Sequence, residues 1–382
     1  MPRTFLTAYP WDLIDEGVDA ALDRLHGELG VSGVSVWAAT PPRELLRPRA
    51  VAPRVFRTRG GLFYQPSPEL FAATRCKPVV SSWLQGRNPL ARIAEGCARR
   101  GLALRARVSA AATGRLANRY PAMACRNVFD VESTERLCLA DPDVQAYLCS
   151  LAADLTGNYG IEGLVLADFG LGWSEAFATR LDAGRDLGEA ERCLLGLCFR
   201  ECCHQKATAA GLDVEVARRV ALAALNESLI SGAALQGGFA DLVAAEPALA
   251  AYLRWQTDEL NGLLRRVAES CRCELLLEWE TGIAAGFQRR SLDCASIAGV
   301  LVRADDPAGV ELAVRAGAPR VESLLGVSQV AGAEPNELVS VLSGFARRGT
   351  PAVEIENYGL LSESALTAVK QAIRYARRSH AG

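Results

Sequence analysis

Acidic residues close several short apolar runs of this sequence, and they are the side chains best suited to chemistry. Asp168 ends one run and Glu280 ends another, while Glu322 and Glu356 lie within or just after two later runs. Hydrolysis of a glycosidic bond uses two carboxyl groups, one protonated as the acid and one ionised as the nucleophile or base. We therefore expect Asp168 and Glu280 to form a catalytic pair, with Glu322 and Glu356 as further catalytic candidates. The alternative is that these acids cap loops or pair with arginines.

Basic, amide and aromatic side chains accompany these acids. Arg105 and Arg107 alternate within one run, so both face the same way and could bind a substrate or pair with the acids themselves. Aromatic rings at strand ends offer flat apolar faces that stack on sugars, or else they pack the mouth of the fold. The expected substrate-binding residues are Trp11, Arg107, Arg126, Asn127, Trp173, Trp279, Asn357 and Tyr358.

The apolar runs alternate regularly with segments of helical periodicity, which predicts a fold built from parallel strands. The predicted strands cover 4–9, 31–38, 102–109, 164–168, 274–280, 296–303, 320–326 and 352–357. Eight such units favour an α/β fold, a (β/α)8 TIM barrel. A doubly wound open sheet is the alternative, and the absence of a Gly-x-Gly-x-x-Gly sequence after the first run counts against its dinucleotide-binding form.

In a barrel, the carboxyl ends of all strands meet at one rim, where barrel enzymes carry their chemistry. The two expected catalytic acids should then project into one cavity, with Leu164, Leu166 and Leu276 filling the barrel below them. Glu278 has the parity to point inward one layer beneath Glu280.

Two insertions are expected in a single barrel domain that covers 1–382. They lie at about 39–85 and 174–270. The first follows the second predicted strand, so it should cover the active mouth of the barrel. Within it, 54–57 and 62–65 are expected to pair as a hairpin joined through a Gly-Gly turn.

Cysteines gather in one helical stretch, at Cys193, Cys198, Cys202 and Cys203. Arg200 interrupts the thiol spacing that would hold zinc. We therefore expect buried free thiols that pack as small hydrophobic groups, with no metal and no cofactor. Zinc held by Cys198, Cys203, His204 and a remote thiol is the alternative.

The composition excludes several classes of partner. The 382 residues include 42 basic and 44 acidic residues, a net charge of −2, so neither nucleic acid nor an anionic membrane is an expected partner. No apolar run approaches the ~20 residues of a membrane span. The 12 cysteines without an export signal indicate reduced thiols and a cytoplasmic protein. A homo-oligomer is compatible with the sequence.

Five segments together resemble an uncharacterised bacterial group of TIM-barrel proteins that are similar to glycoside hydrolases. The segments are Trp11–Gly17, Asn127–Asp130, Leu139–Tyr147, Gly163–Asp168 and Glu356–Leu360. The resemblance implies a carboxylate at the end of the fourth strand, here Asp168 where relatives carry glutamate. It also implies a histidine after the third strand and a histidine-rich loop after the fourth. This chain has neither, because its histidines are His26, His204 and His380.

These observations favour a glycoside hydrolase-like enzyme that acts on a small carbohydrate substrate. A sugar isomerase, epimerase or lyase on the same barrel is one alternative. The lysines, Lys77, Lys206 and Lys370, all lie away from predicted strand ends, which disfavours Schiff-base chemistry. A barrel that binds a ligand or partner without catalysis is the other alternative, and the missing histidines favour it.

Overall fold

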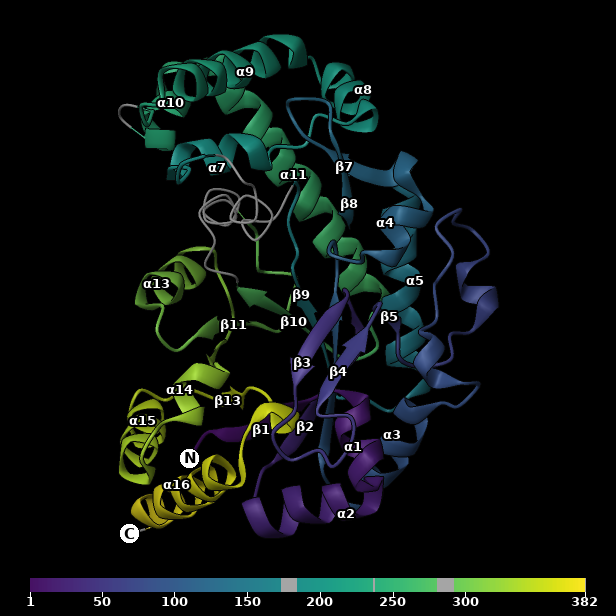
Figure 1. Ribbon diagram of the computed structural model, residues 1–382, viewed down its shortest axis with the longest axis vertical. Helices are drawn as coiled ribbons and strands as arrows, with labels where there is room; N and C mark the ends of the chain where they lie inside the picture. Colours follow the sequence, from purple (N-terminus) through teal and green to yellow (C-terminus); the bar gives the residue numbers. More distant parts are fainter. Residues whose placement is uncertain (173–183, 236–237, 280–291, 382) are drawn as a thin grey trace.

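Eight parallel strands close into a barrel, which confirms the predicted (β/α)8 architecture (Figure 1). The computed structural model describes residues 1–172, 184–235, 238–279 and 292–381. The barrel order is β1-β13-β12-β11-β10-β9-β6-β2, and β2 pairs with β1 to close it. The strands are β1 Arg3–Ala8, β2 Gly33–Thr40, β6 Ala103–Ser109, β9 Gly163–Ala167, β10 Glu274–Trp279, β11 Gly299–Arg303, β12 Val321–Leu325 and β13 Ala352–Ile355.

Helices surround the barrel, and several begin at an Asn-Pro or Asp-Pro pair. Asn88 caps α3, Asp141 caps α5 and Asp306 caps α13, each by accepting a hydrogen bond from a backbone N–H of the first turn. Proline suits the first helical position because its missing N–H has no partner to lose there. The outer helices are α1 Pro10–Glu16, α2 Val18–Asp23, η1 Arg24–Leu29, α3 Pro89–Arg100, α5 Pro142–Asn158, α11 Pro247–Ser270, α13 Pro307–Arg315, α14 Val327–Ala331, α15 Pro335–Arg347 and α16 Glu363–Ala381.

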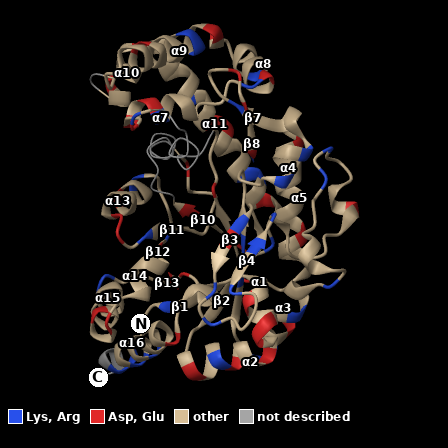
Figure 2. Ribbon diagram, in the orientation of Figure 1, with Lys and Arg blue, Asp and Glu red and all other residues tan. Residues whose placement is uncertain are grey.

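Acidic and basic residues are mixed over these outer helices (Figure 2). Arg100 of α3, for example, pairs with Asp23 of α2 at 2.7 Å. Within the described ranges, no helix has the length and apolar character that a membrane crossing requires.

Alternation along the strands divides their side chains between two cores. Val165, Leu276 and Leu301 form a small cluster inside the barrel. Leu164 and Leu166 belong instead to the large core between barrel and helices, so the expectation that they fill the barrel is wrong. Residue 168 continues the alternation of Leu164 and Leu166, so its side chain is also expected to face away from the barrel interior.

The first insertion packs at the carboxyl end of the barrel. β3 (Arg43–Leu46) and β4 (Val55–Thr58) form an antiparallel hairpin, and Phe56 of β4 stacks on Trp11 at 4.5 Å between ring centroids. The expected hairpin partner is wrong, because β5 (Gly61–Leu62) pairs with the end of β2. The short turns in this segment are η2 Pro68–Phe71 and η3 Ser82–Leu84.

Further elements extend the loops after β6 and β9. The loop after β6 carries α4 Arg115–Arg119, η4 Pro121–Met123, β7 Ala124–Arg126 and β8 Glu132–Leu137. The loop after β9 carries α7 Glu189–Gly196, α8 Glu201–Ala209, α9 Val214–Ser231 and α10 Gly238–Ala245. In Figure 1 these last four helices gather at one end, and α11 returns from them to the barrel. η5 (Tyr358–Leu360) follows β13.

Candidate functional site

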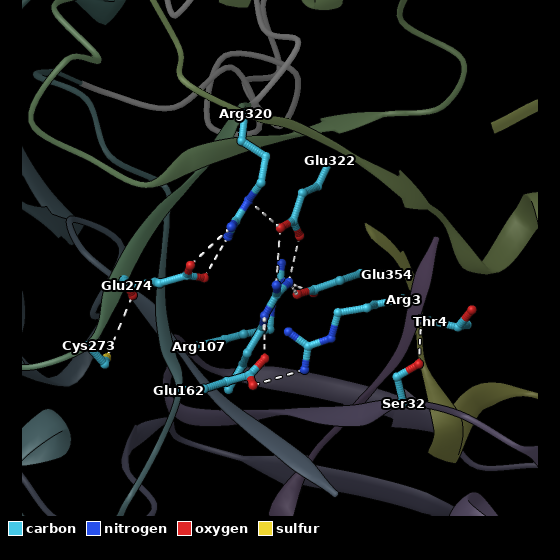
Figure 3. Close-up of polar contacts among 11 residues, drawn as sticks. Arg3, Thr4, Ser32, Arg107, Glu162, Cys273, Glu274, Arg320, Glu322 and Glu354 are labelled. Carbon is cyan, nitrogen blue, oxygen red and sulfur yellow. Dashed lines mark hydrogen bonds and ion pairs between the residues drawn. The ribbon is translucent and has the colours of Figure 1, made fainter. Parts of the chain in front are cut away.

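A network of ion pairs occupies the amino-terminal half of the barrel interior (Figure 3). Arg105 of β6, fully buried, donates hydrogen bonds of 2.6 and 3.1 Å to Glu322 and one of 2.9 Å to Glu354. Arg320 pairs with Glu322 at 2.9 Å and with Glu274 at 2.6 Å. Buried carboxylates require such partners, because an unpaired charge in a low-dielectric interior is strongly destabilising.

The position of Glu322 differs from that of a rim residue. It is the second residue of β12, near the amino end of the strand, and two arginines already bind its buried carboxylate. This arrangement suits a residue that fixes Arg105 in place, and it leaves the Glu322 carboxylate remote from the carboxyl-terminal mouth.

Arg107 carries the network toward the mouth. Its buried guanidinium donates a 2.5 Å hydrogen bond to Glu354 and also bonds to Glu278. It lies over the Trp37 ring, 5.0 Å from the centroid. Glu278 thus points inward as expected, and its side chain is 18% exposed, whereas that of Glu354 is fully buried. Arg107, predicted to bind substrate, is held between these two glutamates.

Glu356 lies at the mouth, just beyond the end of β13. It has the parity of Glu354 and therefore faces the barrel interior. Burial raises the pKa of its carboxyl; Arg107 opposes this rise, and Glu278 adds to it. Among the described residues, no hydrogen bond or ion pair engages its side chain. A partly buried carboxyl group with a raised pKa, free of hydrogen bonds and ion pairs to the described part of the chain, is the arrangement expected of a general acid.

Aromatic rings form one wall of the mouth. Tyr9 stacks on Trp37 at 6.2 Å and on Trp11 at 4.6 Å between ring centroids. Trp11, a predicted substrate contact, is fully buried behind Tyr9 among the rings of the insertion. Tyr9 was not predicted, although it continues the inward parity of Phe5 and Thr7 on β1. Burial raises the pKa of the Tyr9 hydroxyl, Arg43 opposes the rise, and Glu356 adds to it.

Asp168 has a different environment from the acids on the inner strand faces. Its carboxylate accepts hydrogen bonds from Ser109 Oγ at 2.9 Å and from the Ala112 N–H at 2.8 Å, and it pairs with Arg136. Its φ of +60° is uncommon for a residue other than glycine and marks a backbone held by its surroundings. These contacts tie the end of β9 to the loop after β6. A catalytic role for Asp168 stays a prediction.

Two predicted site residues, Glu280 and Trp173, lie outside the described residues, so the expected Asp168–Glu280 pair has no defined geometry. Arg126 and Asn127, which were predicted to bind substrate, interact instead with residues close to them in the sequence. Arg126 pairs with Glu132 at 2.6 Å, and Asn127 accepts hydrogen bonds from the Phe129 and Val131 N–H groups at 3.0 Å each. The structure does not bring these two residues to the barrel interior.

Trp279, Asn357 and Tyr358 were also predicted to bind substrate, and their contacts lie outside the barrel interior. Trp279 is buried in the core between barrel and helices. Asn357 accepts a hydrogen bond from the Gly359 N–H at 3.1 Å and so stabilises the turn after β13. The Tyr358 hydroxyl donates to Glu16 at 2.7 Å, and Arg49 lies over the Tyr358 ring, 4.2 Å from its centroid.

A separate charged cavity of about 370 Å³ lies beside the loops after β1 and β13. Arg47 and Asp12 line it, with the Arg47 Nε 3.3 Å from an Asp12 oxygen. Burial raises the pKa of Asp12 to about 7, although the Tyr9 N–H, Arg47 and Arg49 all favour its ionised form. Acidic and basic residues are mixed in the lining, so no single charge of ligand is favoured.

The fold is similar to that of solved structures, whereas the sequence matches no protein-family model and no curated protein. The structure is similar to alpha-L-fucosidase isoenzyme 2 from Paenibacillus thiaminolyticus, with a TM-score of 0.56 and 12% identity over 100% of this chain and 50% of that one. It is also similar to the beta-galactosidase from the psychrophilic Marinomonas ef1, with a TM-score of 0.55 and 12% identity over 100% of this chain and 60% of that one.

The chain therefore spans half to three fifths of the length of these two proteins. At 12% identity the likeness shows the barrel fold alone and leaves activity to be argued from the site.

Proposed function

We propose that this protein hydrolyses a glycosidic bond at the carboxyl end of its barrel, with Glu356 as the general acid and Glu278 as its carboxylate partner. The observation that carries the proposal is the contrast between these two glutamates. Glu278 is ion-paired with Arg107, whereas the Glu356 carboxyl has a raised pKa and makes no hydrogen bond or ion pair with the residues that the structure describes. Two carboxyl groups whose environments differ in this way can divide the acid and base roles.

In this mechanism the bond between the anomeric carbon and the leaving oxygen breaks, and its electron pair goes to the oxygen. Glu356 donates a proton to that oxygen. Glu278 either attacks the anomeric carbon itself or removes a proton from the attacking water, and a water molecule completes the hydrolysis in both cases. The distance between the two carboxyl groups that flank the bound sugar decides whether Glu278 acts as nucleophile or as base. Glu280 is a further catalytic candidate.

The aromatic wall supports a sugar as the substrate. Tyr9 and Trp37 stack on each other beside Arg107. Such rings bind the apolar C–H face of a sugar, and a protonated Tyr9 hydroxyl can donate a hydrogen bond to a sugar oxygen. The substrate class proposed here is a small carbohydrate or glycoside.

The test is hydrolysis of a panel of phenyl glycosides, whose poor leaving group needs protonation, by the wild-type protein and by Glu278→Gln and Glu356→Gln. Each substitution should lower turnover by roughly 10²–10⁴-fold, the usual contribution of a general acid or base. Glu132→Gln, an exposed glutamate on β8, is the matched control and should keep wild-type turnover.

Added azide distinguishes the two roles, because a small anion can replace a missing nucleophile but cannot replace a missing acid in cleavage of a poor leaving group. Failure of the wild-type protein on every glycoside would refute the proposed function. Wild-type turnover in both glutamine variants would refute the assigned residues.

A further inference from the structure

Five cysteines converge from two loops that are far apart in the sequence. Cys125 lies in β7 and Cys138 follows β8, both within the loop after β6. Cys198 precedes α8, and Cys202 and Cys203 lie in its first turn, within the loop after β9. All of these thiols are fully buried except Cys202, which is partly buried.

Several of these sulfur atoms lie close enough together to share a metal ion, among them those of Cys138, Cys202 and Cys203, and Cys202 Sγ is 3.9 Å from Cys138 Sγ. Cys138 Sγ lies 3.4 Å from Cys203 Sγ and 3.8 Å from Cys198 Sγ, and the last two are 3.9 Å apart. The Cys125 thiol interacts with those of Cys138 and Cys198. A disulfide needs sulfurs at ~2.05 Å, so these distances are not those of bonded pairs. A tetrahedral zinc ion with Zn–S bonds of ~2.3 Å holds its four sulfurs about 3.8 Å apart.

Packing alone does not require this arrangement. Cys76, Cys97 and Cys294 are also buried, and in the part of the chain that the structure describes none of them lies against another thiol. They behave as the small hydrophobic groups that buried free cysteines usually are. The five converging thiols differ from them because each faces at least two others.

We propose that Cys125, Cys138, Cys198 and Cys203 bind one zinc ion. A hairpin that supplies two thiols and a loop-to-helix segment that supplies a Cys-x₄-Cys pair match the ligand spacing of structural zinc sites. Four protein ligands leave no open position, so the ion is structural and takes no part in glycoside hydrolysis. The proposal replaces the expectation of metal-free thiols, which considered ligands near Cys198 in sequence and missed Cys125 and Cys138.

Arg200 supports this assignment. Four thiolates around a zinc ion carry a net charge of −2, which a buried site must offset. The Arg200 guanidinium lies 3.0 Å from Cys202 Sγ and 2.5 Å from an Asp141 oxygen, so it is held beside the thiol cluster. In the sequence Arg200 interrupts the thiol spacing, and in the structure it supplies the neighbouring positive charge.

The ion would join two loops at the carboxyl end of the barrel. The Phe199 N–H donates to the Arg126 carbonyl at 2.7 Å, and the Tyr252 hydroxyl of α11 donates to the Cys198 carbonyl at 2.5 Å. Zinc would thus fix the β7–β8 hairpin against α8 and α11. Its removal should loosen these elements together.

The test is metal analysis of the full chain, purified in a reducing buffer without added metal. We expect about one zinc ion per chain in the wild-type protein. In Cys138→Ser or Cys198→Ser the bound zinc per chain should fall at least roughly tenfold, because each substitution removes a ligand. Cys97→Ser is the matched control for a buried thiol, and Cys202→Ser tests the ligand set; both should retain zinc.

A measurement on the wild-type protein covers variants that fail to fold. Cobalt(II) exchanged for the metal should show the absorption of tetrahedral thiolate coordination. The proposal is overturned by a metal-free wild-type protein with four freely reactive thiols, by iron in place of zinc, or by zinc loss in Cys202→Ser with retention in Cys125→Ser.

Discussion

Replacing Arg107 with methionine removes one cation from the barrel interior and leaves two carboxylates without it. Glu354, fully buried, would keep only its 2.9 Å hydrogen bond from Arg105, while Glu278, 18% exposed, could recover part of its loss from water. Loss of one partner from a buried pair costs about 3–5 kcal/mol, and the remaining bond to Glu354 places Arg107→Met at the lower end of that range. An unfolding entropy of about 2.1 cal/mol/K per residue over 382 residues corresponds to about 1.2 °C per kcal/mol, so the melting temperature should fall by roughly 4–5 °C.

A double-mutant cycle measures the source of this loss. Glu354→Gln alone should cost only about 1–2 kcal/mol, because Arg105 keeps Glu322 and Arg107 keeps Glu278. Combining Arg107→Met with Glu354→Gln removes the uncompensated charge, so the double variant should be more stable than the sum of the single changes predicts by at least about 1 kcal/mol. Urea unfolding of the four proteins gives the coupling free energy.

Arg126→Met is the matched control, because it breaks an ion pair between largely exposed side chains and should cost less than about 1 kcal/mol. If Arg107→Met is as mild as this control, or if the two changes in the cycle are additive, the charges of the barrel interior do not stabilise the fold in the way described.

Three further predictions concern pH and backbone packing. Arg107 lowers the pKa of Glu356, so Arg107→Met should move the alkaline limb of the turnover profile to higher pH; an unmoved limb would exclude Glu356 as the acid. The pKa of Asp12 is about 7 in the folded protein and about 4 when unfolded, so the folded state binds the extra proton between these values. Stability contributed by this group is therefore greatest below about pH 4 and falls as the pH rises to about 7, and thermal melts of Asp12→Asn should show a flatter pH dependence than the wild type. A Cβ on Gly359 would lie 2.1 Å from the Asp12 carboxyl, so Gly359→Ala should destabilise by more than about 1 kcal/mol, whereas Gly332→Ala, with open space around its Cβ, should melt within about 2 °C of the wild type.

The sequence predicts the barrel because each unit carries its own local signals, such as Asp141-Pro142 before α5 and apolar runs on the strands. The hairpin partner was wrong for an equally local reason. Gly60 and Gly61 adopt φ values of +73° and +107°, and the Gly-Gly pair suggested a tight turn between 54–57 and 62–65. In the fold the same glycines return the chain to the edge of β2, and the β4 segment pairs with the residues that precede it.

The site was less predictable because its partners are remote in sequence. Parity alone indicated that Arg105 and Arg107 share a face, but the acids that bind Arg105 lie 217 and 249 residues away. Nothing near Glu322 distinguishes an ion-paired glutamate at the amino end of a strand from one at the rim. The inward position of Tyr9, by contrast, follows from the alternation of β1 and could have been inferred.

The charges inside the barrel also bear on how the chain assembles. Arg105 and Arg107 lie on the third barrel strand, yet Glu354 lies on the eighth and Glu322 on the seventh. A partly assembled barrel of the first four strands would present both guanidinium groups on its inner face without these counter-charges, so covering that face before the later strands pair would be costly. We therefore expect barrel closure to be highly cooperative, with no stable half-barrel fragment, because the eighth strand carries the carboxylate that binds both arginines.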